Sequence, residues 1–222
     1  MCARFSLAAP DRIIVRYPRF RSRLTWPPRF NIAPTQEVLA VRNDAAGEIA
    51  PLRWGLVPGW AQDVAVGPKL INARAETLAE RPAFSDALQH RRCIIFADGF
   101  YEWSGSKKHR RPYRFVVDGG APFAFAGLYE RWGSAANAIE TCTIVTCDAN
   151  ALCASVHARM PVILDDHAID PWLDGTVHDA IETLVPFAPS RMSSFPVTPE
   201  LNRVTFDDPR ALEPIAAEAM LF

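Results

Sequence analysis

The sequence of 222 residues lacks several features that would place it in a specialised class of protein. Its five cysteines are an odd number and include no CxxC pair, so we expect neither a disulfide framework nor a structural zinc site. It has no internal repeat, no low-complexity linker and no apolar run long enough to span a bilayer. The first residues carry charge instead of the regions of a signal peptide. We therefore expect a cytoplasmic protein with reduced thiols, no metal, no cofactor and no membrane partner.

The sequence also lacks a strong net charge, since its formal value is −1. This average covers two unlike parts of the chain. From Asp165 to the end there are eleven acidic and three basic side chains (net −8), and the part before it has a net charge of +7. The basic part contains six arginines within residues 12–29 and the run KKHRR at 107–111. These segments indicate either solvated loops or a basic face for an anionic partner.

The composition and the residue patterns predict one folded domain. Hydrophobic residues make up 49% and charged residues 22% of the chain, which is typical of a globular protein, and we expect a single domain over 1–222. Short β-branched and aromatic segments predict strands within 52–60, 92–103, 112–118, 122–132, 140–150, 159–165 and 194–198. Short helices or turns are expected at 81–89, 171–175, 177–185 and 209–220. The prediction is an α+β fold with a curved, barrel-like core sheet of mixed or antiparallel strands, flanked by short helices.

Polar side chains interrupt three of the apolar segments, and a buried unpaired polar group costs about 1–3 kcal/mol. Glu102 lies in "GFYEW", Asn72 and Arg74 lie in "INARAET", and His157 and Arg159 lie in "VHARMP". Taken singly, each has a structural explanation: Glu102 in a salt bridge, Asn72 as a helix cap and His157 as a packing residue. Taken together with a nucleophile, they form the set of groups that an active site needs.

The stretch "MCARF" supplies a candidate nucleophile, Cys2. Removal of the initiator methionine would expose both its thiol and its α-amine. An α-amine has a reference pKa of about 8 and can condense with an aldehyde to an imine, which the adjacent thiol can attack. The product is a five-membered thiazolidine, and its formation benefits from the high effective concentration of an intramolecular thiol.

Eight stretches match the motifs of one protein family, in the same order and across most of the chain. They are "MCARF" (1–5), "NIAPTQ" (31–36), "RWGLVPGWA" (53–61), "INARAET" (71–77), "RRCIIFADGFYEW" (91–103), "FAGLYERW" (125–132), "TIVTCDAN" (143–150) and "VHARMPVIL" (156–164). On these stretches the chain resembles the SRAP family (SOS response-associated peptidase), the abasic-site processing proteins of bacteria and eukaryotes. The segment "PVTPELNRV" (196–204) fits more loosely.

The resemblance implies a covalent mechanism at the N-terminus. Family members look for abasic sites in single-stranded DNA, and their N-terminal cysteine couples to the aldehyde of the ring-opened sugar as a thiazolidine. By motif, Cys2 would be the nucleophile through amine and thiol, and Asn72 would orient the cysteine and the sugar. Glu102 would be the general acid or base for ring opening and imine formation, and His157 a second proton-transfer group.

The resemblance also implies a binding surface for single-stranded DNA that contains abasic sites. The residues carried over for it are Arg4, Pro34, Arg74, Trp103, Thr146 and Arg159. The three arginines would contact phosphates, and Trp103 would stack on a base. Trp60 is a further candidate for this surface, although a core position is the expectation for it. The protein would then be a monomer that associates with the nucleoid when bound to DNA.

Two other functions stay open on the sequence. The family name records a proposed self-cleavage of the residue before the cysteine, which implies an autoproteolytic or peptidase activity beside the lyase-like crosslinking. A non-covalent single-strand-binding module is the other alternative. One departure from the family pattern is Ala3, where glycine is usual, and it adds a methyl group next to the nucleophile.

Overall fold

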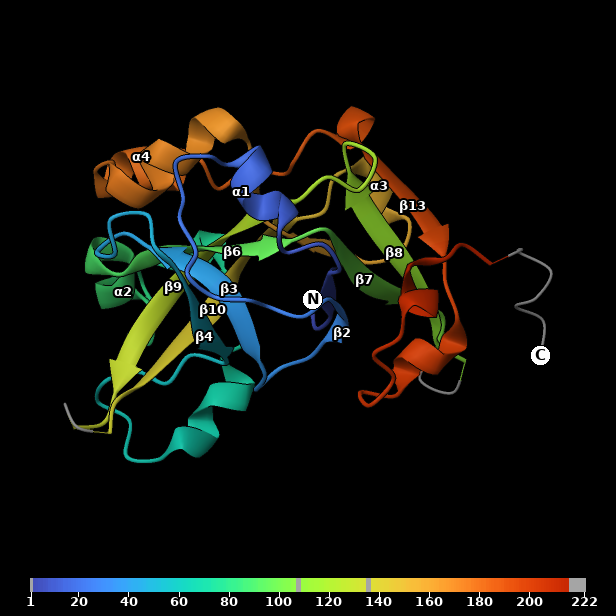
Figure 1. The fold of residues 1–222 in the computed structure, drawn as a ribbon. Coiled ribbons are helices and arrows are strands. Elements are labelled where there is room, and N and C mark those ends of the chain that lie inside the picture. The colour runs from blue at the N-terminus through green and yellow to red at the C-terminus, as the bar shows by residue number, and fades with distance from the viewer. Residues whose placement is uncertain (1, 107–108, 135–136, 216–222) are drawn as a thin grey trace.

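The computed structural model describes residues 2–106, 109–134 and 137–215, and it confirms the expected α+β fold with a barrel-like core (Figure 1). Five strands pair in the order β10-β4-β3-β6-β9, and β9 pairs with β10 again, so the sheet closes into a barrel. The β4–β10 pair is parallel and the other pairs are antiparallel, which makes the barrel mixed. The barrel strands are β3 (Glu37–Arg42), β4 (Ile49–Trp54), β6 (Arg92–Ala97), β9 (Phe123–Trp132) and β10 (Ile139–Asp148).

Three short strands extend the barrel at its margins. They are β5 (Asn72–Arg74) and β11 (Arg159–Pro161), which both pair with β10, and β12 (Ile163–Leu164), which pairs with β9. The strand predicted over 159–165 is therefore two short strands on different neighbours. The long strands predicted at 122–132 and 140–150 are confirmed as β9 and β10.

A second, antiparallel sheet packs beside the barrel, with the strand order β13-β8-β7-β1-β2. Its strands are β1 (Phe5–Leu7), β2 (Arg29–Ile32), β7 (Gly99–Ser104), β8 (Arg111–Val117) and β13 (Met192–Pro196). Phe5 of β1 joins the two sheets, because its ring lies 5.2 Å from that of Trp54 and 5.7 Å from that of Phe125, both in the barrel. The aromatic core therefore fixes the N-terminal strand against the barrel.

The helices are short, as expected, and cover parts of the barrel. They are α1 (Arg12–Arg16), α2 (Ser85–His90), α3 (Ala151–Ala154), α4 (Ile169–Asp174) and α5 (Val177–Glu182), with 3₁₀ turns at Val64–Lys69, Ala75–Thr77, Asp166–Ala168, Pro189–Arg191, Pro199–Asn202 and Pro209–Leu212. Helix α2 contacts β6 and β9, and helix α4 contacts β6. Because both faces of β6 and β9 are buried, their sequences are nearly continuous apolar runs without alternating polar residues.

The helix expected over 209–220 is a 3₁₀ turn at Pro209–Leu212, and its residues from 216 onward lie outside the described part, as does Met1. Within the described part, no helix has the length and hydropathy that crossing a membrane requires.

The segment predicted as one strand over 92–103 is two strands in different sheets. Its first half, β6, belongs to the barrel, and its second half, β7, belongs to the second sheet. The chain passes from one to the other at Asp98 and Gly99, where a bulge or turn was predicted. A Cβ atom at Gly99 would lie 2.7 Å from Nε of Arg114, so any other residue would have to displace the buried Arg114 side chain.

A buried ionic cluster holds this crossing in place. Asp98 accepts hydrogen bonds from the Ser6 hydroxyl (2.6 Å), the Ala8 backbone N–H (2.5 Å) and the Arg114 guanidinium (3.2 Å). All three side chains of this cluster are buried. The carboxylate therefore joins β1, the β6–β7 crossing and β8 through buried hydrogen bonds.

Replacement of Asp98 is expected to weaken the whole fold. Asp98→Ala leaves the buried Arg114 charge uncompensated, which costs about 3–5 kcal/mol of the free energy of unfolding. Urea denaturation measures this loss. The matched control is Asp166→Ala, which removes an exposed ion pair with Arg16 and should cost less than about 1 kcal/mol. Equal losses in both variants would contradict a special role for the buried cluster.

Candidate functional site

A cavity of about 510 Å³ collects residues from distant parts of the chain. It is lined by Ala3, Arg4, Lys69, Ile71, Asn72, Glu102, Trp103, Gly105, Arg110, His157 and Asn202. Five of these were predicted as site residues: Arg4, Asn72, Glu102, Trp103 and His157. A larger cavity, of about 820 Å³, lies beside α4 and α5 and is lined by none of the predicted site residues. The smaller, more polar cavity is therefore the candidate site.

Cys2 lies directly beside this cavity and is held by Asn72. Its carbonyl oxygen accepts a hydrogen bond from Nδ2 of Asn72 (2.7 Å), and its thiol lies 3.7 Å from the carbonyl oxygen of Arg4. The side chain of Cys2 is 0% exposed. Burial raises the pKa of the thiol well above its usual range, and the nearby Glu102 carboxylate raises it further.

Asn72 reaches Cys2 because of an unexpected local structure. Of the two interpretations of Asn72 from the sequence, a helix cap or a residue that orients the cysteine, the helix cap is wrong: Asn72 begins β5 and pairs with Ile144 of β10. A 3₁₀ turn follows at Ala75–Thr77, and the Asn72 side chain does not cap it. The oxygen of the amide, Oδ1, is buried and accepts no hydrogen bond from any residue in the described part of the chain. It is available to a donor that enters the cavity.

Glu102 contributes a carboxyl group from β7, on the side of the second sheet. Its side chain is buried, and burial raises its pKa above the ordinary value, while the charge of the nearby His157 opposes this effect. A carboxyl group with a raised pKa keeps its proton to a higher pH than an exposed one and can give it to a departing oxygen. Glu102 and His157 therefore lie close enough to influence each other, although 55 positions separate them in the chain.

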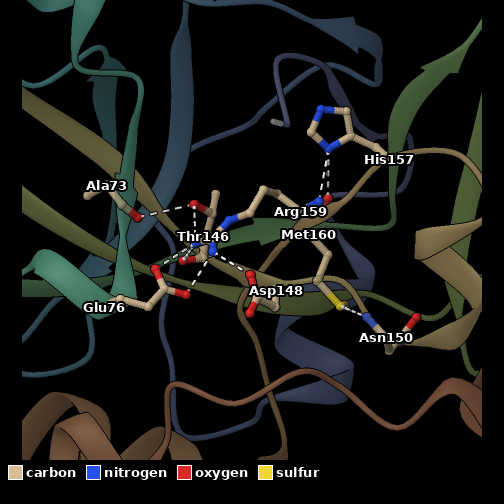
Figure 2. Close-up of polar contacts among 8 residues, drawn as sticks. All are labelled: Ala73, Glu76, Thr146, Asp148, Asn150, His157, Arg159 and Met160. Carbon is tan, nitrogen blue, oxygen red and sulfur yellow. Dashed lines mark hydrogen bonds and ion pairs between the residues drawn. The ribbon is translucent and has the colours of Figure 1, made fainter.

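His157 lies between α3 and β11, half-buried at the wall of the cavity. Its backbone N–H bonds to the carbonyl oxygen of Cys153 (2.9 Å), which fixes it to the end of α3. Its ring nitrogen Nδ1 lies 3.0 Å from the backbone N–H of Arg159, the first residue of β11. This contact orients the imidazole (Figure 2).

The side chain of Arg159 extends into an ion-pair cluster with Glu76 and Asp148 (Figure 2). Its guanidinium bonds to both oxygens of Glu76 (2.7 and 2.9 Å), to Asp148 (2.8 Å) and to the carbonyl oxygen of Thr146 (2.7 Å). The ion pair holds the pKa of Glu76 below its usual range. Arg159 was predicted as a phosphate contact, and the structure places it outside the cavity lining, in contact with carboxylates.

Arg4 and Trp103 face each other at the cavity. The guanidinium carbon of Arg4 lies 5.9 Å from the centre of the Trp103 ring, within the range of a cation–π contact. Arg4 also donates to Asn31 Oδ1 (2.9 Å) and to the Leu201 carbonyl oxygen (3.0 Å), and Trp103 Nε1 donates to Asn202 Oδ1 (2.8 Å). Both side chains are thereby fixed in position.

The remaining predicted binding residues do not line the cavity. Pro34 is half-buried in the turn between β2 and β3, and Arg74 is exposed at the end of β5. Thr146 is buried in β10, where its hydroxyl lies 3.4 Å from the Ala73 carbonyl oxygen. Trp60, expected in the core, is 67% exposed, so that expectation is wrong.

Three cavity residues with polar or charged side chains were not predicted as site residues: Lys69, Arg110 and Asn202. Arg110 belongs to the basic run at 107–111. The sequence indicated a basic face or a solvated loop for this run but did not place it at the site, and residues 107–108 lie outside the described part. Lys69 ends a 3₁₀ turn and had no signal in the sequence. Among the described residues, no group of three or more His, Cys, Asp or Glu side chains could hold a metal ion.

Comparison with known proteins places this arrangement in a family. Residues 1–204 match the family model described as SOS response associated peptidase (SRAP). The chain is 40% identical over 222 aligned residues to the abasic site processing protein YoqW of Bacillus subtilis, covering 96% of this chain and 99% of that one. It is 31% identical over 180 aligned residues to the abasic site processing protein YedK of Escherichia coli, covering 78% and 79%.

Solved structures agree on the fold. A crystal structure of a protein from Bacteroides thetaiotaomicron superposes with a TM-score of 0.87 at 24% identity, covering 97% of this chain and 100% of that one. One from Bordetella bronchiseptica gives a TM-score of 0.76 at 29% identity, covering 89% and 100%. The barrel, the second sheet and the family match together show that this chain belongs to the SOS response associated peptidase (SRAP) family.

Proposed function

We propose that this protein processes abasic sites by capturing the ring-opened sugar in single-stranded DNA covalently through Cys2. One observation carries the proposal: Asn72 bonds to Cys2 at the edge of a cavity that Glu102 and His157 also line. A nucleophile, an orienting amide and two proton-transfer groups thus meet at one place, although they come from four separate segments. The names of the curated relatives as abasic site processing proteins support the same function.

The proposed chemistry begins once Met1 has been removed, because only then does Cys2 carry an α-amine. The amine adds to the C1′ aldehyde of the ring-opened sugar, and the resulting carbinolamine loses water to give an imine. The thiol then adds to the imine carbon, its proton passing to the nitrogen, and a thiazolidine closes. The sum is one aldehyde and one aminothiol combined with loss of one water.

Glu102 is proposed as the proton donor and acceptor for these steps. A buried carboxyl group with a raised pKa can protonate the sugar oxygen during ring opening and the hydroxyl group that leaves as water. His157, which lines the same cavity, would take or return the second proton. The free Oδ1 of Asn72 would accept a hydrogen bond from the α-amine or from a sugar hydroxyl.

The DNA strand is proposed to cross the cavity between Trp103 and the basic residues of its rim. Trp103 gives a base a stacking surface, and Arg4 beside it gives a phosphate a cationic partner. Lys69 and Arg110 are exposed and add two further positive charges at the same cavity. The exposed Trp60 is a further candidate for stacking. Binding through this local charge does not require a basic protein overall.

Cys2→Ala is expected to abolish a denaturation-resistant adduct with an oligonucleotide that bears one abasic site. Intact-mass spectrometry before and after incubation measures both Met1 removal and adduct formation. Cys147→Ala, which removes another buried thiol, is the matched control and should keep the adduct. An adduct that persists in Cys2→Ala would falsify the thiazolidine mechanism.

The same experiments separate the two alternative functions. Wild-type protein that cleaves a peptide in trans but forms no adduct would favour the peptidase. Equal affinity for intact and abasic strands, without an adduct, would favour the non-covalent single-strand-binding module.

Glu102→Gln is expected to slow adduct formation by about 100-fold or more, since it removes the proton-transfer group.

The same substitution should change the pH dependence of the free energy of unfolding. Because the pKa of Glu102 is raised in the folded state, the wild-type protein loses stability as the pH rises above the ordinary carboxyl value near 4.5. The free energy of unfolding of Glu102→Gln, relative to wild type, should therefore increase between pH 4.5 and pH 8.

The control for Glu102 is Glu182→Gln, an exposed residue of α5 that does not line the cavity. It should leave the rate of adduct formation unchanged. An unchanged rate in Glu102→Gln would remove Glu102 from the proton-transfer role. A relative stability that stays constant with pH would contradict the raised pKa.

Lys69→Ala is expected to reduce the salt dependence of single-stranded DNA binding. Loss of one phosphate contact should lower the slope of log K against log salt concentration by roughly 0.7. Fluorescence anisotropy titrations at several salt concentrations measure the slope. Arg23→Ala, an exposed arginine outside the cavity, should leave it unchanged. Equal slopes for wild type and Lys69→Ala would show that the strand does not pass Lys69.

A further inference from the structure

A short turn near the end of the chain holds two of the residues that line the candidate site. In the 3₁₀ turn Pro199–Asn202, the carbonyl oxygen of Leu201 accepts a hydrogen bond from Nη1 of Arg4 (3.0 Å). The next residue, Asn202, accepts one through Oδ1 from Nε1 of Trp103 (2.8 Å). Two consecutive residues of one turn therefore fix the proposed phosphate contact and the proposed stacking residue.

The turn is anchored by a small apolar cluster that is separate from the main core. Leu201 is 0% exposed, and the other buried members of the cluster are Tyr101, Val197, Phe206 and Ala211. Tyr101 lies in β7, two residues before Trp103, and the Trp103 side chain packs against the same cluster. The turn is thus attached to the strand that carries Trp103.

Arg4 is held from two sides but keeps free donors. Besides its bond to Leu201, Nη1 donates to Oδ1 of the buried Asn31 (2.9 Å). Nδ2 of Asn31 donates in turn to the carbonyl oxygens of Arg203 (3.1 Å) and Phe206 (2.7 Å), just after the turn. Nε and Nη2 of Arg4 have no hydrogen-bond partner in the described part of the chain. Arg4 therefore has a fixed position and can still donate to a phosphate.

Asn202 determines how the Trp103 ring is oriented. The indole has one polar atom, Nε1, at its outer edge, and a hydrogen bond there restricts rotation about both side-chain torsions. The amide of Asn202 is itself held, because its Nδ2 lies 3.4 Å from the carbonyl oxygen of Arg110. With Nε1 engaged, Trp103 has no donor left for the edge of a base and offers only its ring surface.

We propose that Asn202 is a positioning residue: its Oδ1 fixes the plane of the Trp103 ring in the orientation that stacks on a base, before the strand arrives. Fixing a contact surface in advance lowers the entropic cost of binding. Asn202 acts through Trp103, so it affects the affinity for the strand and not the rate of the chemical steps. The DNA-binding part of this inference rests on the proposed function, and the Asn202–Trp103 contact does not.

The first test observes the indole without DNA. In the full-length protein labelled with ¹⁵N, Trp103→Phe identifies the Nε1–H signal of Trp103 among those of the six tryptophans. We expect this proton to exchange slowly with water in wild type, and to shift upfield and exchange faster in Asn202→Ala. Asn202→Asp keeps an acceptor oxygen and should retain the slow exchange. An Nε1–H signal that does not change in Asn202→Ala would overturn the proposal.

The second test separates affinity from chemistry. The rate of adduct formation is measured against the concentration of an oligonucleotide that bears one abasic site. In Asn202→Ala we expect the half-saturating concentration to rise roughly five-fold, the equivalent of one neutral hydrogen bond, and the rate at saturation to stay within about two-fold of wild type. A fall in the saturating rate alone would mean that Asn202 acts on the chemical steps, and would overturn the positioning role.

A double variant decides whether Asn202 acts through Trp103. Trp103→Phe keeps an aromatic ring but removes the N–H that Asn202 holds. Adding Asn202→Ala to it should therefore raise the half-saturating concentration no further. A further five-fold rise would mean that Asn202 contacts the strand itself, and would contradict the proposal.

Asn43→Ala is the matched control for these tests. It removes an asparagine amide that donates to the His90 carbonyl oxygen (3.2 Å), outside the cavity. The Trp103 signal and the half-saturating concentration should not change. A loss of affinity equal to that of Asn202→Ala would reduce the effect to general stability and overturn the proposal. If wild-type protein neither binds the strand nor forms an adduct, the proposed function fails, and the spectra still decide whether Asn202 fixes the Trp103 ring.

Discussion

The buried carboxylate of Asp98 is the constraint on which the rest of the site depends. It binds the Ser6 hydroxyl, the Ala8 backbone and the Arg114 guanidinium, and so fixes β1 to the point where the chain leaves the barrel. Cys2 lies four residues before Ser6, and Glu102 lies four residues after Asp98. One ionic cluster therefore sets the positions of the proposed nucleophile and the proposed acid relative to each other. The absence of a side chain at Gly99 makes room for it.

The candidate site lies between the barrel and the second sheet, and each contributes half of it. Cys2 and Glu102 belong to the second sheet, through the segment before β1 and through β7. Asn72 begins β5 and His157 lies two residues before β11, and both of these strands pair with β10 of the barrel. The hydrogen bond from Asn72 to the Cys2 carbonyl crosses this boundary. Because both halves are rigid sheets, the geometry of the site is as fixed as the packing between them.

The basic side chains of this protein have two roles: some are available to bind an anionic strand, and others form ion pairs that stabilise the fold. Arg4, Lys69 and Arg110 line the cavity, where they can meet an anionic strand, whereas Arg114 and Arg159 are neutralised by carboxylates. A guanidinium with five donors in a fixed fork is suited to both tasks. Which task an arginine performs depends on its neighbours in space, and these neighbours lie up to 83 positions away in the chain, as Glu76 does from Arg159.

The sequence by itself determined the fold class, the main strands, the family and the residues of a reactive set, because apolar patterning and motif order are local properties. Only the tertiary structure decided how that set is assembled. It divided the segment 92–103 between two sheets, decided between the two interpretations of Asn72, exposed Trp60 and directed Arg159 to Glu76. These outcomes depend on strand pairing and on ion pairs between distant segments, and no local pattern of residues encodes the distance between two side chains.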